Sequence, residues 1–335
     1  MKQKTLSLYL ATVYILCACS GSGRASGSLV YTGYGASSYS LESNTEYKKV
    51  IKKGKLKAVD LLYTCYVENE KDHKIDCNSY DSPNEKNFIK LALQLKKLGH
   101  QVTLRIYVDL KNEKWRAYWR PTDDKKAFLN LSKTIVRFAA IATQIGAKAL
   151  IIGSEYEGLT VPKYLSQWKS IIAETKKKFY GEVLYAANGN PNKNNEPEYL
   201  RVPFWYLLDT IGVNYYPPFN GAPTKKNLHA HHRKQLEKYK KFSTTQKKKL
   251  AITEIGFPLA ESGIKTPYQW LYSKTEKPNS KLRALSMRSF LEEAHKQGVH
   301  DIHLWRFLFN EPKIHPLGYV IDEEVLQVMP LLNKK

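Results

Sequence analysis

Short apolar stretches of strand length alternate with longer amphipathic stretches along most of the chain. The apolar stretches cover residues 29–34, 58–66, 101–109, 147–155, 182–187, 209–216, 250–254 and 301–305. The stretches between them show helical spacing of apolar residues over 42–53, 85–98, 123–145, 162–179, 198–208, 228–242 and 281–297. Apolar runs without polar alternation are typical of parallel strands covered on both faces. This order predicts a parallel α/β fold.

The boundaries of these helices carry recognisable start and stop signals. Ser82-Pro83-Asn84-Glu85 resembles a capping box with proline at the first helical position, and Gly99, Gly146 and Gly298 follow three of the helices. Eight strand units in 335 residues predict a single-domain (β/α)8 TIM barrel, which needs about 250 residues. A doubly wound open sheet is the alternative, but no glycine-rich phosphate loop follows the first strand.

Two of the apolar runs end in a glutamate, Glu155 and Glu254. In a barrel the C-terminal ends of the strands carry the chemistry, so these carboxylates are expected to meet there. Aromatic, amide and acidic residues are expected at the same end: Tyr107, Asp109, Asn188, Tyr215, Tyr216 and Trp305. Aromatic rings stack on sugars while amides and carboxylates bind hydroxyls. A pair of carboxylates in such surroundings is typical of a glycosidase.

Several motifs make this chain resemble clan A of the glycoside hydrolases, most closely glycoside hydrolase family 113, the β-mannanase-type barrels. The matching stretches are 108–109 with 115–116, 152–155, 184–188, 202–205 leading into 211–213, and 253–256. They occur in the family's order and on the corresponding strands. The resemblance covers nearly all of the chain after the first thirty residues.

The resemblance implies that Glu155 is the acid/base and Glu254 the nucleophile of a retaining, endo-β-mannanase-like hydrolase that needs no metal or cofactor. It implies an oligo- or polysaccharide substrate and sugar-contacting positions at Asn188, Tyr215 or Tyr216, and Trp305. We expect the remaining substrate-binding residues to be Tyr107, Asp109, Trp115 and Ser154. From the residues alone, Asp109 is expected to orient its neighbours instead of reacting.

Three positions depart from the family pattern. Ser154 stands where clan A enzymes commonly have asparagine, Cys65 where a tryptophan is expected, and Tyr107 where a histidine is more usual. Because of these changes, the sequence does not determine which sugar is bound. The changes also leave one alternative open, a non-catalytic glycan-binding lipoprotein on the same barrel. Adhesion to anionic polymers, driven by the basic charge of the chain, is a third possibility.

The N-terminus has the pattern of a targeting segment. Lys2 and Lys4 precede an apolar stretch, 6–16, that is too short to span a membrane. The following Leu16-Cys17-Ala18-Cys19 resembles a bacterial lipoprotein signal in which Cys19 is lipidated, and a Gly/Ser-rich stretch follows.

We therefore expect a signal peptide at 1–18, a tether at 19–28 and the catalytic domain at 29–335, in an exported, membrane-anchored lipoprotein on the periplasmic or cell-surface side. An ordinary secretory signal cut near Ala18 is the alternative.

Export bears on the two remaining cysteines, Cys65 and Cys77, which we expect to form a disulfide in an oxidising compartment. Metal binding is not expected, because no Cys or His pair nearby has zinc-ligand spacing. His229, His231 and His232 lie in a lysine-rich segment and are interpreted as a solvated cluster.

The net charge of +22 favours contact with anionic surfaces such as lipid head groups, lipopolysaccharide or acidic glycans. The lysine runs are dispersed along the sequence, near 48–53, 176–178 and 247–249, so solvated helix faces are the alternative. Nucleic-acid binding is not predicted.

Overall fold

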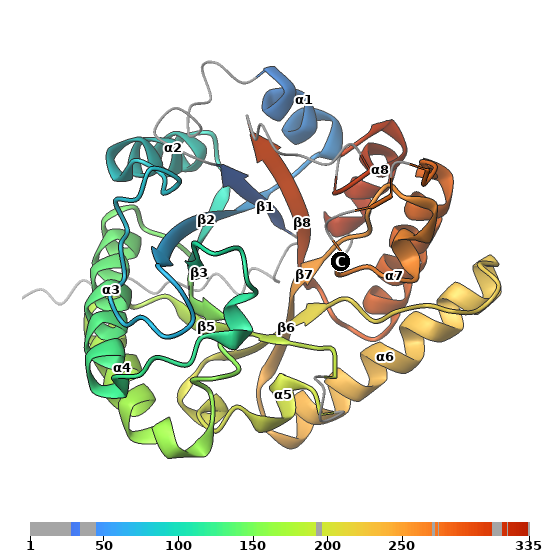
Figure 1. Cartoon of the computed structure of the whole chain (residues 1–335). Coiled ribbons are helices and arrows are strands. Elements are labelled where there is room, and N and C mark those ends of the chain that lie inside the picture. The colour runs from blue at the N-terminus through green and yellow to red at the C-terminus, as the bar shows by residue number, and fades with distance from the viewer. Residues whose placement is uncertain are drawn as a thin grey trace, which may run out of the picture.

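Eight parallel strands close into a barrel in chain order, β1 to β8, in the computed structural model (Figure 1). The structure describes residues 28–33, 45–191, 196–269, 272–273, 275–309, 317–319 and 321–333. The predicted signal peptide, Cys19 and residues 20–27 of the predicted tether lie outside the described residues. Among the described helices, none is long and apolar enough to cross a membrane.

The strands are β1 (Ser28–Gly33), β2 (Ala58–Val67), β3 (Gln101–Leu110), β4 (Ala149–Ser154), β5 (Glu182–Asn188), β6 (Thr210–Tyr215), β7 (Lys249–Ile255) and β8 (Asp301–Phe309). Each pairs with the next in parallel, and β1 closes the barrel against β8. The predicted single-domain (β/α)8 barrel is confirmed.

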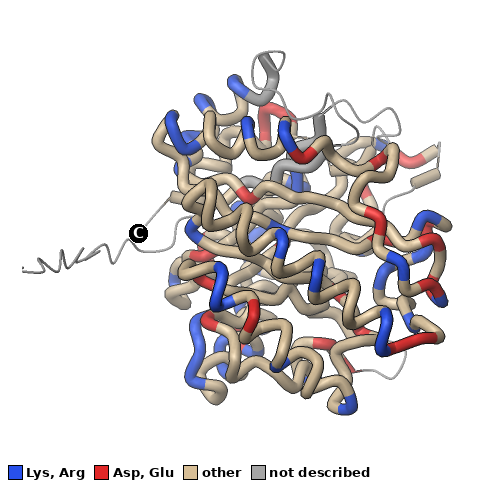
Figure 2. Tube along the Cα trace, turned by 90° about the vertical axis from the view of Figure 1, so that its left-hand side faces the viewer, with Lys and Arg blue, Asp and Glu red and all other residues tan. Residues whose placement is uncertain are grey.

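The helices surround the strands and cover their outer faces (Figure 1). They are α1 (Thr45–Gly54), α2 (Glu85–Lys97), α3 (Asp124–Gln144), α4 (Leu165–Lys178), α5 (Glu198–Arg201), α6 (Lys225–Thr245), α7 (Ser280–Lys296) and α8 (Glu323–Val328). Short 3-10 turns accompany them: η1 (Arg116–Tyr118), η2 (Pro162–Tyr164), η3 (Trp205–Leu207), η4 (Glu261–Ile264) and η5 (Met329–Asn333). Their outer surface carries many charged residues of both signs (Figure 2).

One predicted helix is wrong. The stretch 198–208 is divided into α5 and η3, because Pro203 lacks an amide hydrogen and holds the preceding Val202 in an extended conformation at ψ 116°. Helix α8 was not predicted. It begins at Asp322, whose side chain accepts a hydrogen bond from the amide of Val325.

The core has two parts because each strand alternates between the barrel interior and the helix layer. A large cluster fills the space between strands and helices, and a smaller one inside the barrel contains Ala149, Ile151, Leu184, Ala186 and Ala251. Strands β4 and β6 are buried at every position. This two-sided burial explains why their sequences read as unbroken apolar runs.

Cys65 and Cys77 form a disulfide in the structure, which joins β2 to the loop after it. The hydroxyl of Tyr63 donates a hydrogen bond to the carbonyl of Cys77 at 2.9 Å and holds the same loop. Both Tyr63 and Cys65 belong to the core on the helix side of the strand. Position 65 therefore faces the helices, so this departure from the family pattern does not change the interior of the barrel.

Candidate active site

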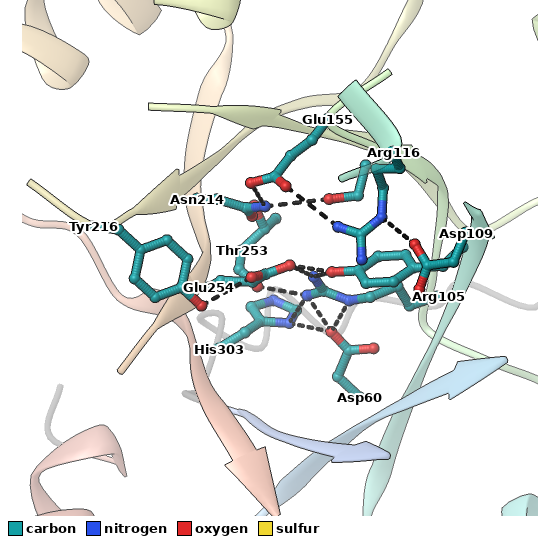
Figure 3. Close-up of polar contacts among 12 residues, drawn as sticks. Asp60, Arg105, Asp109, Arg116, Glu155, Asn214, Tyr216, Thr253, Glu254 and His303 are labelled. Carbon is teal, nitrogen blue, oxygen red and sulfur yellow. Dashed lines mark hydrogen bonds and ion pairs between the residues drawn. The ribbon is translucent and has the colours of Figure 1, made fainter. Parts of the chain in front are cut away.

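Glu254 comes from β7 and is 4% exposed at the C-terminal end of the barrel. The hydroxyl of Tyr216 donates to its Oε2 at 2.8 Å, and Arg105 donates through Nη1 to Oε1 at 3.0 Å (Figure 3). The hydroxyl of Tyr107 also donates to Oε1. Burial raises the pKa of Glu254, the charge of Arg105 opposes this, and Glu155 adds to the increase. Three donors therefore fix this carboxylate, and one of them is a full positive charge.

The turn after Glu254 depends on Gly256. A Cβ atom at this position would lie 2.4 Å from the carbonyl oxygen of Trp305 in the neighbouring strand. Glycine thus lets the end of β7 pass close to β8. Trp305 itself is buried and stacks on Tyr107 with ring centroids 6.3 Å apart, so it supports a residue that contacts Glu254.

A chain of buried charges lies beneath Glu254, inside the barrel (Figure 3). Arg105 donates through Nε to Asp60 Oδ2 at 2.9 Å, and His303 Nδ1 lies 2.7 Å from the same oxygen. His303 Nε2 is 3.3 Å from Asp301. Arg105 contacts both Asp60 and Glu254, so the negative charge of Glu254 is balanced by a positive charge inside the barrel.

The pKa values of Asp60 and His303 shift in opposite directions. Burial opposes the ionisation of Asp60, yet the charges of Arg105 and His303 hold its pKa below the usual range. Burial also opposes a charged imidazole, but hydrogen bonds to Asp301 and Asp60 raise the pKa of His303. Both shifts favour the charged, ion-paired forms.

Glu155 follows the last residue of β4 and has an unusual backbone conformation. Its φ is 56°, in the left-handed region that non-glycine residues rarely adopt, and its amide donates to the carbonyl of Ala186 at 2.9 Å. Asn214 donates to Oε1 at 2.9 Å, and Trp115 Nε1 donates to Oε2 at 2.8 Å. Such strain is typical of residues that a functional site holds in place.

Arg116 links Glu155 to Asp109 and to the ring of Tyr107. It donates through Nη1 to Glu155 Oε2 at 3.2 Å, and its guanidinium lies 3.9 Å from the ring centroid of Tyr107. Its Nε donates to Asp109 at 2.6 Å. Asp109 thus contacts the arginine that holds Glu155, as its expected orienting role requires.

A side-chain amide donates to Glu155, but it belongs to Asn214 of β6. The family pattern places an asparagine at position 154 of β4 instead. Asn214 on β6 donates through Nδ2 to the hydroxyl of Ser154 at 3.1 Å as well as to Glu155. Its Oδ1 accepts a hydrogen bond from Thr253 at 2.8 Å. Ser154 and Glu155 therefore share one amide donor from β6.

The structure gathers most of the predicted site residues into one cluster. Its members are Tyr107, Asp109, Trp115, Ser154, Glu155, Tyr216 and Glu254, with Trp305 stacked against it. Asn188 pairs with Asn214 of the cluster through the backbone, but its side chain donates to Glu157 at 3.2 Å and its backbone amide donates to Glu198. Burial raises the pKa of Glu198 to about 8.

The sugar contact predicted for Tyr215 is wrong. Its hydroxyl lies 2.8 Å from His232 Nδ1, and its ring packs on Phe290 of α7 at 4.7 Å. Successive strand residues face opposite sides, so Asn214 points into the barrel and Tyr215 out of it. His232 is 1% exposed, so the expected solvated histidine cluster is also wrong. Across the described ranges, no group of three or more His, Cys, Asp or Glu side chains is placed to hold a metal ion.

Sequence reasoning assigned no role to five members of the site: Asp60, Arg105, Arg116, Asn214 and His303. Arg116 lies in the matching stretch 115–116, and a signal also existed for two others. Asp60 and Arg105 are opposite charges inside apolar runs on neighbouring strands, and such charges are rarely buried unless they pair.

Comparisons with known proteins agree with this geometry. The sequence model of Glycoside Hydrolase Family 113 matches residues 32–307. A comparison with curated protein sequences finds no match.

Among solved structures, a complex of a family 113 β-1,4-mannanase has a TM-score of 0.78 at 16% identity, covering 91% of this chain and 97% of that chain. The family 113 β-mannanase AaManA from Alicyclobacillus acidocaldarius has a TM-score of 0.73 at 15% identity, covering 91% and 95%. Fungal β-1,4-galactanases reach 0.55 at 13% identity, covering 90% and 98%. At these identities the likeness shows the shared fold.

Proposed function

Because this chain belongs to glycoside hydrolase family 113, we propose that it is a retaining endo-hydrolase of a β-linked, mannan-like polysaccharide, tethered to a bacterial membrane through Cys19. The observation that carries the catalytic part is the contrast between two buried carboxylates. Glu254 pairs with the fully buried Arg105 and accepts hydrogen bonds from two tyrosine hydroxyls. Glu155 has a strained backbone, pairs with Arg116, whose side chain is 14% exposed, and accepts hydrogen bonds from an indole and an amide. Two carboxylates in different surroundings are what an acid and a nucleophile require.

In the proposed reaction Glu254 attacks the anomeric carbon while the glycosidic bond breaks. Protonated Glu155 gives its proton to the leaving oxygen. Glu155 then takes a proton from water, and the water oxygen attacks the anomeric carbon and releases Glu254. Arg105 favours the ionised nucleophile, and Tyr107 and Tyr216 hold its two oxygens in a fixed plane.

Mannan is proposed as the substrate class because the similar family 113 structures are β-mannanases. Ser154 and Tyr107 differ from the residues that are usual in this family. At Ser154, the side-chain amide of Asn214 lies within hydrogen-bond distance of the serine hydroxyl, so the site still contains an amide there. The alternative is a non-catalytic glycan-binding protein. It is disfavoured because binding a glycan does not require two buried carboxylates, Glu155 and Glu254, in one site.

The test is hydrolysis of manno-, gluco- and xylo-oligosaccharides by the wild-type chain and by Glu254→Gln and Glu155→Ala. We expect one sugar series to be cleaved internally, with loss of activity in both variants. Glu157→Gln is the matched control, since Glu157 is a buried glutamate two positions beyond Glu155 that binds Asn188 and Arg201 instead.

Stereochemistry tests the retaining step. Azide added to Glu155→Ala with an activated aryl glycoside should form a glycosyl azide of retained configuration. Glycan binding without hydrolysis, with an affinity that Glu254→Gln does not change, would establish the binding protein instead. The tether is tested separately by incorporation of labelled fatty acid, which Cys19→Ser should abolish.

A further inference from the structure

The barrel brings lysines that are far apart in the sequence to one end. Every connection from a helix to the next strand lies at the N-terminal end of the strands, opposite the active site. We call this end the basal face. It is formed by the last turns of the helices and the residues before β2, β3, β4, β5, β7 and β8.

The three dispersed lysine runs meet on the basal face together with lysines that sequence reasoning did not connect to them. The set is Lys52, Lys53, Lys55, Lys57, Lys96, Lys97, Lys148, Lys176, Lys177, Lys178, Lys240, Lys241, Lys247, Lys248, Lys249 and Lys296. Acidic residues neutralise part of this charge, since Lys53, Lys176, Lys177, Lys249 and Lys296 each form an ion pair.

The remaining charge is exposed and unbalanced. Within the described part of the chain, the following exposed basal lysines form no ion pair: Lys52, Lys55, Lys57, Lys97, Lys178, Lys241 and Lys247. Lysines in the last turn of a helix are favoured by the helix dipole, which gives some of them an intramolecular reason. That reason does not apply to Lys55, Lys57 and Lys247, which follow the helices.

The opposite end of the barrel carries the carboxylates. Asp109, Glu155, Glu157, Glu198 and Glu254 all lie at or just beyond the C-terminal ends of strands. Figure 2 shows the barrel from the side, with Lys and Arg predominating toward the left and both signs mixed toward the right. The active site and the basal face therefore differ in charge, and an anionic surface is attracted to the end that does no chemistry.

We propose that the basal face lies against the anionic head groups of a lipid bilayer, with the active site directed away from the membrane. The occupant is argued from the position of Ser28, which begins β1 on this face between Ala58 and His303. The chain that precedes it, residues 1–27, therefore joins the barrel at the same end as the lysines. The choice of a lipid surface rests on the proposed tether, whereas the charge asymmetry does not.

The tether is short enough to keep this face near its anchor. Even fully extended, the nine residues from Cys19 to the start of β1 at Ser28 reach at most about 32 Å. Electrostatic attraction at physiological ionic strength acts over about 8 Å. A barrel anchored within this reach stays close to the membrane, where the basal lysines favour the orientation that brings them to the head groups.

The experiment uses a chain that begins at Ser20, which keeps all eight strands and all described helices but cannot be lipidated. Its binding to vesicles of phosphatidylglycerol mixed with phosphatidylcholine is compared with binding to phosphatidylcholine alone. The basal variant carries glutamine at Lys55, Lys57, Lys178 and Lys247. The control variant carries glutamine at exposed lysines near the active-site end, namely Lys86, Lys125, Lys226 and Lys265.

We expect binding only to the anionic vesicles. Each lysine near the surface contributes about a fivefold change in partitioning, so the basal variant should bind at least about tenfold more weakly while the control changes by less than about threefold. Raising the salt to about 1 M should abolish binding. Equal losses in the two variants, or no binding by the wild-type chain, would overturn the proposal.

Two further readouts separate this inference from the proposed activity. Bound wild-type chain should hydrolyse a soluble oligosaccharide as fast as free chain, because its active site faces outward. Lysine-dependent vesicle binding by a chain that cleaves no glycoside would keep the docking face and refute only the activity. Binding to soluble dextran sulfate with none to anionic vesicles would refute the membrane as the occupant.

Discussion

Arg105 is the residue on which the charge balance of the site depends, and Arg105→Met tests that balance. The side chain is completely buried and contacts Asp60, Glu254 and the carbonyl of Thr253. Methionine fills similar space without charge, so the substitution leaves two carboxylates in the barrel interior. His303 still pairs with Asp60, whereas Glu254 keeps only the two tyrosine hydroxyls.

The expected magnitude follows from these contacts. At an effective dielectric constant of about 20, opposite charges about 4 Å apart attract by about 4 kcal/mol. Removing one partner of a buried pair costs about 3–5 kcal/mol of stability, because the other charge stays buried and uncompensated. Urea denaturation should show a loss in this range near pH 7.

The same substitution should change the pH dependence of catalysis. Arg105 opposes the increase that burial causes in the pKa of Glu254, so its loss raises that pKa further. The nucleophile must be ionised to attack, and the acid limb of kcat/KM should therefore move to higher pH. The loss of activity should be greatest at low pH and partly recover as the pH rises.

The double variant Arg105→Met with Asp60→Leu separates stability from catalysis. It also removes the carboxylate of Asp60, which Arg105→Met alone leaves without its arginine. Part of the stability should return, because replacing a buried ion pair by an apolar pair of similar volume costs little. The displaced acid limb should remain. A stability loss below about 1 kcal/mol in Arg105→Met, with an unmoved acid limb, would refute this account of the charge chain.

Three other predictions follow from single contacts. Tyr216→Phe removes a donor to Glu254 and should lower kcat by about ten- to a hundredfold, whereas Tyr215→Phe, whose hydroxyl faces His232, should leave kcat unchanged in steady-state assays. The pKa of Glu198 in the folded chain, about 8, exceeds the ordinary value of 4.5 for a glutamate, so this group favours folding below about pH 4.5 and loses that contribution as pH rises through 8. Glu198→Gln should flatten the fall in stability across this window, gaining about 1 kcal/mol or more near pH 8 in urea titrations, and an unchanged slope would contradict burial as the cause. Gly256→Ala should destabilise the chain by about 1–3 kcal/mol in thermal unfolding, because its methyl group meets the carbonyl of Trp305 at 2.4 Å, and a neutral result would show that the turn can move.

Much of the fold was readable from the sequence because its signals are local. Apolar runs, helix caps and glycine stops repeat within a few residues, and eight repeats leave few arrangements other than a barrel. The helix predicted over 198–208 failed at Pro203, although proline is itself a local signal. The two strand-end glutamates were also recognisable, since strand direction alone brings strand ends to one rim.

The tertiary structure decided which side chains meet inside that rim. The choice between Tyr215 and Tyr216 depends on which face of β6 points into the barrel, and a strand that is buried at every position does not reveal this in its sequence. The contacts of Arg105 with Asp60 and Glu254 join three strands, and the amide of Asn214 reaches Glu155 from another strand. Lysine runs that look dispersed in sequence share one face because barrel closure places all helix-to-strand connections at the same end. Local periodicity determines the elements of this protein, whereas register and closure determine the charges that face one another.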